Sequence, residues 1–182
     1  MTDKEKESKG KESMPEPRHY NVMFLCTGNS ARSIMAEAIM NRMGAPHFTA
    51  FSAGSRPAGK VREEALRQLE EAGLSTQGLR SKSWDEFAAP AAPRLDFIFT
   101  VCDNAAKEAC PYWPGHPMTA HWGVPDPAAA EGSPEQIRRA YYDAFTALEQ
   151  RIGLFLCLPL ATLDSMALQR EIDKIGGQQA AS

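Results

Sequence analysis

Four short apolar runs along the chain have the length and composition of buried strands. The first, Tyr20 to Cys26 (YNVMFLC), combines β-branched and aromatic residues and ends at the turn cluster TGNS. Such a continuous apolar run is typical of a strand that is covered on both faces. Phe48 to Ser52 and Leu95 to Val101 predict two further strands, and Met118 to His121 predicts a short fourth one.

Between and after these runs, apolar residues recur at the three- and four-residue spacing of amphipathic helices. Gly44 ends the first of these segments, and Ser133 with Pro134 has the composition of a helix start. Pro159 interrupts the long apolar segment near the C-terminus. The helices predicted in this way are Ala31 to Met43, Lys60 to Ala72, Ser133 to Cys157 and about Thr162 to Ile175.

The alternation of strands and helices predicts an α/β fold with a parallel sheet and helices on both of its faces. In such sheets, ligands bind at the carboxyl ends of the strands. Cys26 closes the first predicted strand, and Cys102 directly follows the third. We therefore expect the two thiols on the same edge of the sheet.

The chain of 182 residues fits one domain with short extensions. Residues 1–18 are charged and almost free of large apolar side chains, so they predict a disordered tail. We place the main domain at residues 19–158, and a C-terminal helix and tail at residues 159–182.

Charge and hydropathy argue against several partners and locations. The formal net charge is -3 and no long Lys/Arg block occurs, so we expect no nucleic-acid partner. The tail lacks the apolar core of a secretory signal, and the apolar stretch Ile152 to Leu163 is too short to span a bilayer. We therefore expect no membrane association and a cytoplasmic protein, whose four cysteines are reduced and are catalytic, metal-binding or inert.

The strongest chemical signal is the segment CTGNSARS, residues 26–33, between the first strand and the first helix. A cysteine, five residues and an arginine form a cradle in which backbone amides and the positive end of the helix face a tetrahedral oxyanion. Gly28 and Asn29 tolerate the unusual backbone angles that such a loop needs. The expected oxyanion-binding residues are Thr27, Gly28, Asn29, Ser30, Ala31 and Arg32.

The same loop supplies a nucleophile. Its field stabilises a thiolate, so we expect the pKa of Cys26 to fall below the usual range of a thiol. Arg32 would grip two oxygens of the anion, and Ser33 would donate a hydrogen bond to the sulfur. A chance occurrence of this spacing is disfavoured by the strand before it and the helix after it.

A thiolate that attacks an oxyanion needs a proton donor for the oxygen that leaves. Asp126, in HWGVPDP, lies in a loop fixed by two prolines and is the candidate general acid. An aspartate beside proline is also a common turn residue. The residues alone leave these two interpretations even.

The run VMFLCTGNSARSIMAEA resembles the start of the low-molecular-weight tyrosine phosphatases and of the arsenate reductases related to them. The resemblance covers most of the chain after the tail. It implies a four-stranded parallel sheet flanked by helices, in three Rossmann-like layers, with an extended C-terminal helical segment. It also implies that Cys26 is the nucleophile and that Asp126, in an Asp-Pro loop late in the chain, is the general acid.

Two features favour the reductases over the phosphatases. The phosphatases place aromatic residues after the Asp-Pro pair, whereas Asp126 and Pro127 are followed here by three alanines. The segment TVCDNAAKEACP instead carries Cys102 and Cys110, as in the arsenate reductases.

The resemblance implies a thiol relay without a required cofactor. Reduction of arsenate to arsenite takes two electrons, which two thiols supply when they form a disulfide. Cys26 attacks arsenate, Cys102 attacks Cys26, and Cys110 attacks Cys102 to leave a disulfide that thioredoxin reduces. The segment DNAAKEA is expected to be a short helix that rearranges, because bonded cysteines need Cα atoms within ~7 Å. Phosphate or sulfate would mimic the substrate.

Two departures from the reductase pattern stand out. Ala31 occupies a position where well-known members carry another cysteine, and one additional residue separates Cys102 from Cys110. Some members bind potassium beside the loop. The residues that match this pattern are Asn29, Glu37 and Ser52, with the remaining acidic ligand unidentified.

Other interpretations stay open at this point. The loop could serve a tyrosine phosphatase, or the thiols could form a non-catalytic redox or metal sensor. A zinc site would draw on Cys102, Cys110, His116 and His121, but their spacing matches no close-paired zinc pattern.

Several other residues are expected to be structural. Cys157 is predicted to be a buried, inert cysteine. His121 and Trp122 are expected to orient the segment HWGVPDP that carries Asp126, here called the acid loop. Core or half-core positions are predicted at Tyr141, Tyr142 and Phe145.

Overall fold

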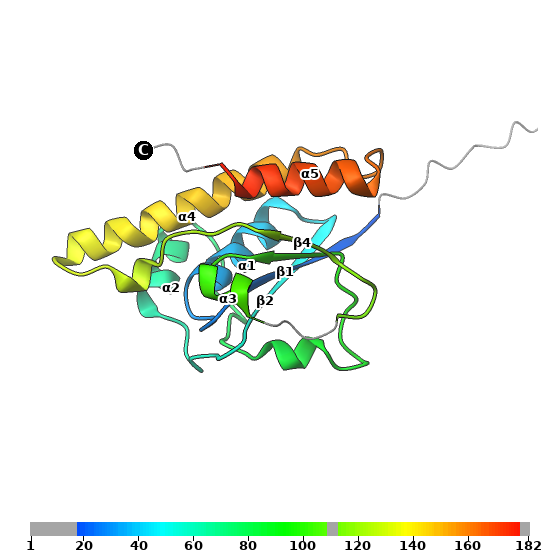
Figure 1. The fold of residues 1–182 in the computed structure, drawn as a ribbon. Coiled ribbons are helices and arrows are strands. Elements are labelled where there is room, and N and C mark those ends of the chain that lie inside the picture. Colours follow the sequence, from blue (N-terminus) through cyan, green and yellow to red (C-terminus); the bar gives the residue numbers. More distant parts are fainter. Residues whose placement is uncertain (1–17, 109–112, 179–182) are drawn as a thin grey trace, which may run out of the picture.

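A four-stranded parallel sheet forms the centre of the molecule (Figure 1). The computed structural model describes residues 18–108 and 113–178. The strand order is β2-β1-β3-β4, and each neighbouring pair is parallel. The strands are β1 (Tyr20–Cys26), β2 (Phe48–Gly54), β3 (Phe97–Thr100) and β4 (Met118–His121). The predicted sheet is thereby confirmed.

The predicted helices are present, with ends that differ by a few residues. The second begins at Glu63 instead of Lys60, because the Arg62 amide is hydrogen-bonded to the Ser30 carbonyl. The last begins at Ser165, where the Asp164 side chain accepts a hydrogen bond from a backbone amide and caps the helix. The helices are α1 (Arg32–Met43), α2 (Glu63–Glu71), α3 (Asp103–Lys107), α4 (Pro134–Leu156) and α5 (Ser165–Gly176), with 3₁₀ turns η1 (Trp84–Phe87) and η2 (Pro127–Ala129).

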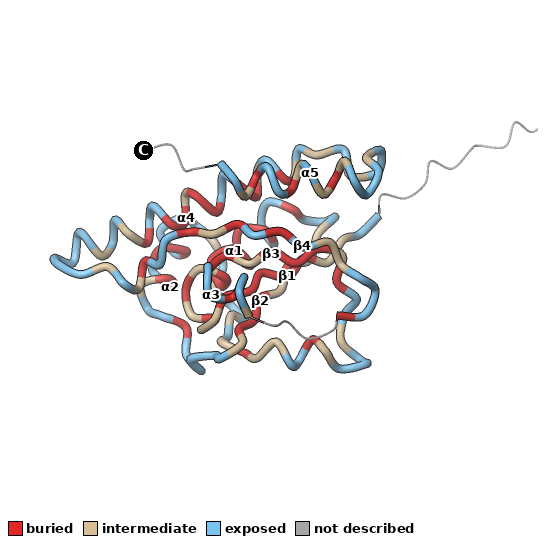
Figure 2. Tube along the Cα trace, in the orientation of Figure 1, coloured by how far each residue is buried: buried red, intermediate tan, exposed pale blue. Residues whose placement is uncertain are grey.

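The two faces of the sheet are covered differently. Val22 and Phe24 on β1 join a large apolar cluster with residues of α1, α2, α4 and α5. Met23 and Leu25, on the opposite face, pack in a smaller cluster with Phe87 of η1. The central strand β1 is therefore buried on both faces, as its mostly red trace in Figure 2 shows, and this explains its unbroken apolar sequence.

Trp122 anchors the segment that leads from β4 to the predicted acid loop. Its side chain is fully buried, and its ring stacks on Phe99 at a centroid distance of 3.7 Å. Its indole nitrogen donates a 2.9 Å hydrogen bond to the Ile172 carbonyl of α5. The acid loop thus starts from a fixed point in the core.

Two predictions of burial on the long helix are wrong. Cys157 is exposed instead of buried, because it caps α4 on the side away from the apolar stripe that ends at Phe155. Tyr141 and Phe145 are buried, whereas Tyr142 is 50% exposed because it lies beside this stripe.

The proposed domain limits are not tested by the fold, and most of the N-terminal tail lies outside the described residues. Among the described helices, none is long and apolar enough to cross a membrane.

Candidate active site

The loop between β1 and α1 has its carbonyls outward and its amides free. The carbonyls of Thr27, Gly28 and Ser30 accept hydrogen bonds of 2.9–3.0 Å from backbone amides in the segment 56–62. Within the described part of the chain, the amides of residues 29–32 have no acceptor. A ring of unpaired N–H groups is a binding site for an anion with several oxygens.

The start of α1 adds to this positive field. Its N-cap residue, Ala31, makes no side-chain capping hydrogen bond, and its first turn contains no acidic residue. The amides and dipole of a helix start are usually balanced by such groups. Here they remain available to an external anion.

Asn29 in the loop and Gly54 beside it allow this loop geometry. Asn29 has a positive φ of 45°, as the sequence suggested, whereas Gly28 is not in the left-handed region and that part of the prediction is wrong. A Cβ atom on Gly54, at the end of β2, would lie 2.4 Å from the Thr27 carbonyl oxygen. Gly54 is therefore required for the close approach of β2 to the loop, a role that the sequence alone did not reveal.

Cys26 and Cys102 form a buried pair of thiols at the base of the loop. Both side chains are buried, at 6% and 3% exposure. The Thr27 amide donates a 3.3 Å hydrogen bond to Cys102 Sγ, and the Ala105 amide donates another of 3.4 Å. The thiols meet because β1 and β3 are adjacent parallel strands that end at the same edge.

The hydrogen bonds around this pair favour the thiolate form of Cys102. The hydrogen bond from the Cys26 thiol, assisted by those from Ala105 and Thr27, lowers the pKa of Cys102 to about 5. The same hydrogen bond and burial raise the pKa of Cys26, while Arg32 and the Gly28 amide lower it to a smaller extent. The prediction of a lowered pKa at Cys26 is therefore wrong for the paired thiols, because Cys102 has more hydrogen-bond donors.

Arg32 and Asp126 face each other across the site. Arg32 Nη1 donates a 2.9 Å hydrogen bond to the Val124 carbonyl, and its Nη2 lies 3.6 Å from Asp126 Oδ2. Asp126 also caps η2 by accepting a 3.0 Å hydrogen bond from Ala128. The cleft here is lined by Arg32, Cys102, Asp103, Asn104, Gly123, Val124, Pro125 and Asp126.

Ser33 is in the site but has a different contact from the predicted one. Its Oγ accepts a 2.8 Å hydrogen bond from Asn29 Nδ2, and no hydrogen bond to Cys26 Sγ is found among the described residues. The hydroxyl thus supports the positive-φ residue of the loop instead of the sulfur.

The segment after Cys102 forms the expected short helix, α3. Cys102 caps this helix, and Glu108 follows it. Glu108 Oε1 accepts a 3.5 Å hydrogen bond from Thr27 Oγ1, so the end of α3 is also held against the loop. Cys110 lies outside the described residues.

The residues proposed for zinc do not converge in the described structure. His121 Nε2 lies 2.8 Å from Asp103 Oδ1, and its Nδ1 lies 2.8 Å from Thr100 Oγ1. Among the described residues, no group of three His, Cys, Asp or Glu side chains could hold a metal ion. His121 instead joins β4 to the first residue of α3.

The residues matched to the potassium pattern lie together, but a lysine shares their space. Lys82, a buried side chain that the sequence did not single out, places its Nζ 3.8 Å from Glu37 Oε1 and 3.5 Å from Ser52 Oγ. Asn29 Oδ1 accepts a 2.9 Å hydrogen bond from the Lys82 amide, so this oxygen is already engaged. The cluster does not fit a potassium ion, because an ammonium already supplies the positive charge.

Burial acts on both charges of this cluster. It raises the pKa of Glu37 and lowers the pKa of Lys82, while each charge opposes the shift of the other. Glu37 and Lys82 therefore depend on each other to stay ionised in the buried space beside Asn29.

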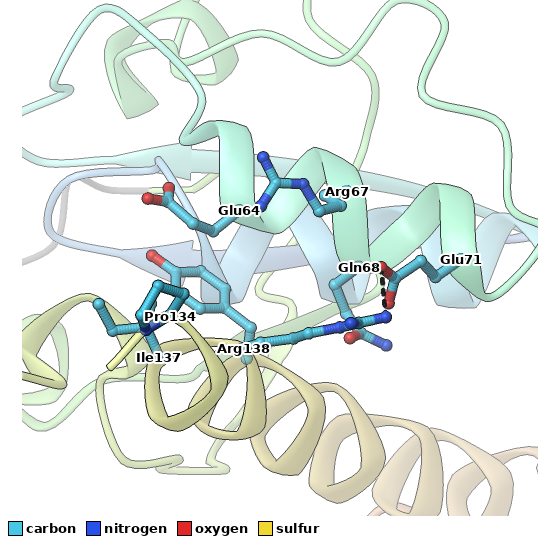
Figure 3. A pocket seen from close by; sticks show the side chains of 8 residues that line it. Glu64, Arg67, Gln68, Glu71, Pro134, Ile137 and Arg138 are labelled. Atoms are coloured by element: carbon cyan, nitrogen blue, oxygen red, sulfur yellow. Dashed lines mark hydrogen bonds and ion pairs between the residues drawn. The ribbon is translucent and has the colours of Figure 1, made fainter. Parts of the chain in front are cut away.

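A second pocket lies away from these residues, between α2 and α4 (Figure 3). An ion pair of 2.9 Å joins Arg138 to Glu71 at one end of it. It contains none of the cysteines or loop residues, so it is not the candidate active site.

Thiolate titration tests the assignment of charge. With Cys110 and Cys157 replaced by serine, absorbance at 240 nm should show a thiolate that persists down to a pH of about 5. Cys102→Ser should remove this titration, while Cys26→Ser should largely keep it because the introduced hydroxyl can still donate to Cys102. The reverse pattern would place the charge on Cys26.

Gly54→Ala tests the close approach of β2. The added methyl group would collide with a backbone oxygen, so the loop must shift; we expect sulfate affinity to fall at least tenfold and the melting temperature to decrease. Calorimetric titration measures the first effect. The control is Gly153→Ala, whose Cβ would meet only Met43 Cε, at 3.7 Å, and which should bind sulfate normally.

Lys82→Met tests the lysine in the predicted potassium cluster. Loss of the ammonium leaves a buried carboxylate uncompensated, so we expect the free energy of unfolding to fall by about 3–5 kcal/mol. Glu37→Gln in the same chain should restore most of this loss. In the unaltered protein, potassium chloride and choline chloride at equal ionic strength should give the same melting temperature. A higher melting temperature in potassium chloride alone would contradict the conclusion that this cluster does not bind potassium.

Comparison with known proteins identifies the family of the chain. A family model described as low molecular weight phosphotyrosine protein phosphatase matches residues 21–171. An arsenate reductase of Oceanobacillus iheyensis is 31% identical over 134 residues, which cover 74% of this chain and 93% of that protein.

Two solved structures are similar as well. The arsenate reductase from Archaeoglobus fulgidus is 31% identical with a TM-score of 0.54, covering 72% of this chain and 98% of its own. An arsenate reductase in the phosphate binding state is 27% identical with a TM-score of 0.57, covering 74% and 97%. The chain therefore belongs to the low molecular weight phosphotyrosine protein phosphatase family, in which the relatives named here are arsenate reductases.

Proposed function

We propose that the protein reduces arsenate to arsenite through Cys26, Cys102 and Cys110, and that thioredoxin restores the reduced thiols. The observation that carries this proposal is the buried contact between Cys26 and Cys102 at the base of an anion loop. A phosphatase needs one thiolate, whereas a two-electron reduction needs a second thiol within reach of the first. The arsenate reductase relatives support the choice of anion.

The first step forms a bond between sulfur and arsenic. Arsenate binds to the amides of residues 29–32 with Arg32, and Cys26 Sγ attacks the arsenic atom. The Cys26 proton passes to the Cys102 thiolate, its hydrogen-bond partner. One arsenic–oxygen bond breaks, and the oxygen leaves as water with a proton from Asp126. Arsenic remains in the +5 state.

The second step transfers two electrons. Cys102 loses its proton to solvent through the cleft that it lines and attacks Cys26 Sγ as a thiolate, and the sulfur–arsenic bond breaks with its electron pair on arsenic. Arsenite leaves, and a Cys26–Cys102 disulfide remains. Cys110 then attacks Cys102 Sγ, which releases Cys26 as a thiolate and leaves a Cys102–Cys110 disulfide.

Thioredoxin, or another protein dithiol, is proposed for the last step. Asp103, Asn104 and Lys107 of α3 are exposed, so the helix that follows Cys102 borders solvent. Because Cys102 itself is buried, a disulfide between Cys102 and Cys110 would become accessible to a dithiol protein through the proposed rearrangement of α3. A cycle that starts from reduced thiols fits the reducing conditions of the cytoplasm.

The residues after Asp126 support reduction over phosphatase action. Pro127–Ala129 forms η2 and presents small side chains beside the cleft. No aromatic side chain follows Asp126 in this turn to stack on a phenyl ring. The anion loop and Asp126 could still cleave small phosphate esters slowly.

The decisive assay follows NADPH oxidation with arsenate, thioredoxin and thioredoxin reductase. The unaltered protein should turn over continuously. Cys26→Ser should be inactive, and Cys102→Ser and Cys110→Ser should give no turnover beyond the first cycle. Cys157→Ser is the matched control and should retain full activity, because Cys157 is exposed and outside the site.

Two outcomes would contradict the proposal. Hydrolysis of an aryl phosphate without arsenate-dependent oxidation would identify a phosphatase. Tight binding of arsenite or zinc without turnover would identify a thiol sensor.

A further inference from the structure

Arg151, on α4, is a buried arginine outside the site described above. Its exposure is 8%, and no carboxylate forms an ion pair with it among the described residues. Burial lowers the pKa of its guanidinium. A buried charge without a carboxylate is costly and must be balanced by hydrogen-bond acceptors.

The acceptors of Arg151 are backbone carbonyls at the base of the acid loop. Its Nη1 donates to the Trp122 carbonyl at 2.8 Å and to the Gly123 carbonyl at 2.6 Å. The next carbonyl, that of Val124, accepts from Arg32 at 2.9 Å. Three successive carbonyls are thus held by two guanidinium groups, two residues before Asp126.

The opposite side of this segment is held by β3 and its extension. The Trp122 amide donates to the Thr100 carbonyl at 2.7 Å, and the Val124 amide donates to the Val101 carbonyl at 3.0 Å. The segment 122–124 is therefore fixed by amides on one side and by arginines on the other. Its position sets where Asp126 can stand relative to Arg32.

The C-terminal helix meets the same segment. Arg151 Nη2 donates to the Gln178 carbonyl at 3.2 Å, and a Cβ on Gly176 would lie 2.1 Å from the His121 carbonyl oxygen. Arg151 thus joins α4, the end of α5 and the acid loop.

We propose that Arg151 is a positioning residue for the general acid, which holds carbonyls 122 and 123 so that Asp126 stays opposite Arg32. This inference rests on the proposed function, because it assigns a role within the same reaction. Arg151 does not line the cleft that contains Arg32, Cys102 and Asp126, so it would act only through the acid loop.

The chemistry of the side chain favours this role over simple packing. One guanidinium satisfies three carbonyls from two segments with a rigid, planar set of donors, which an ammonium cannot reproduce. Arg151→Lys keeps the charge and most of the volume but loses this geometry. A displacement of about 1 Å in a reacting group can cost about 10²-fold in rate.

The test is a double-mutant cycle between Arg151→Lys and Asp126→Asn. The measurement is the single-turnover rate of arsenate-dependent disulfide formation, at a temperature where every variant is folded. Arg151→Lys should slow this rate about tenfold to 10²-fold, with sulfate affinity changed less than threefold. Adding it to Asp126→Asn should cause no further loss, since the acid it positions is already absent.

The control is Arg138→Gln, which removes an exposed arginine of the same helix and should leave the rate unchanged. Multiplicative losses in the cycle, or an unchanged rate in Arg151→Lys, would overturn the inference while the reductase assignment stands. Failure of the unaltered protein to react with arsenate would instead overturn the proposed function.

Hydrogen exchange supplies a readout that does not depend on activity. The Val124 amide is bonded to the Val101 carbonyl, so release of the neighbouring carbonyls should accelerate its exchange. We expect exchange at least tenfold faster in Arg151→Lys than in Arg138→Gln. Equal exchange in the two variants would show that Arg151 does not hold the acid loop.

Discussion

The unbalanced positive field of the loop after β1 is the constraint on which the rest of the site depends. Its amides face inward only because its carbonyls are bonded to residues 56–62, and this needs the close approach of Gly54. The start of α1, without a cap or an acidic residue, adds to the field. Such a loop is costly unless neighbours fix it, and the buried Asn29, with Lys82 and Glu37, provides that support.

The two thiols have different properties, whereas a phosphatase needs only one thiolate. The contact between the thiols raises the pKa of Cys26 and lowers that of Cys102, so it favours a neutral Cys26 and leaves the field of the loop to an incoming anion. In the proposed first step, the same hydrogen bond gives Cys26 a proton acceptor. Cys102 is stabilised by donors from Thr27 and α3, so its charge depends on the helix that the proposed relay requires to rearrange.

Most of the fold and the centre of the site could be predicted from the sequence. The buried strand that ends at Cys26, and the apolar strand before Cys102, put both thiols at one edge because parallel strands share a direction. The contacts that could not be predicted join distant segments. Lys82 reaches Glu37 only through the path of a loop, and the direction of the pKa shift at Cys26 depends on how many donors surround its partner. The periodicity of apolar residues in the sequence predicts neither this contact nor this pKa shift.

The contacts of Arg32 connect anion binding to the acid. Its guanidinium donates a hydrogen bond to the Val124 carbonyl and approaches Asp126 in the same cleft, so one side chain contacts both the anion loop's surroundings and the proposed general acid. Because Arg32 lies close to Asp126, an anion bound by Arg32 would also lie close to Asp126. This works only if the acid loop cannot follow Arg32 when the guanidinium turns toward the anion. The bonds of residues 122–124 to β3, to Val101 and to Arg151 hold this loop by contacts other than the one with Arg32, and the proposed positioning role of Arg151 rests on these contacts.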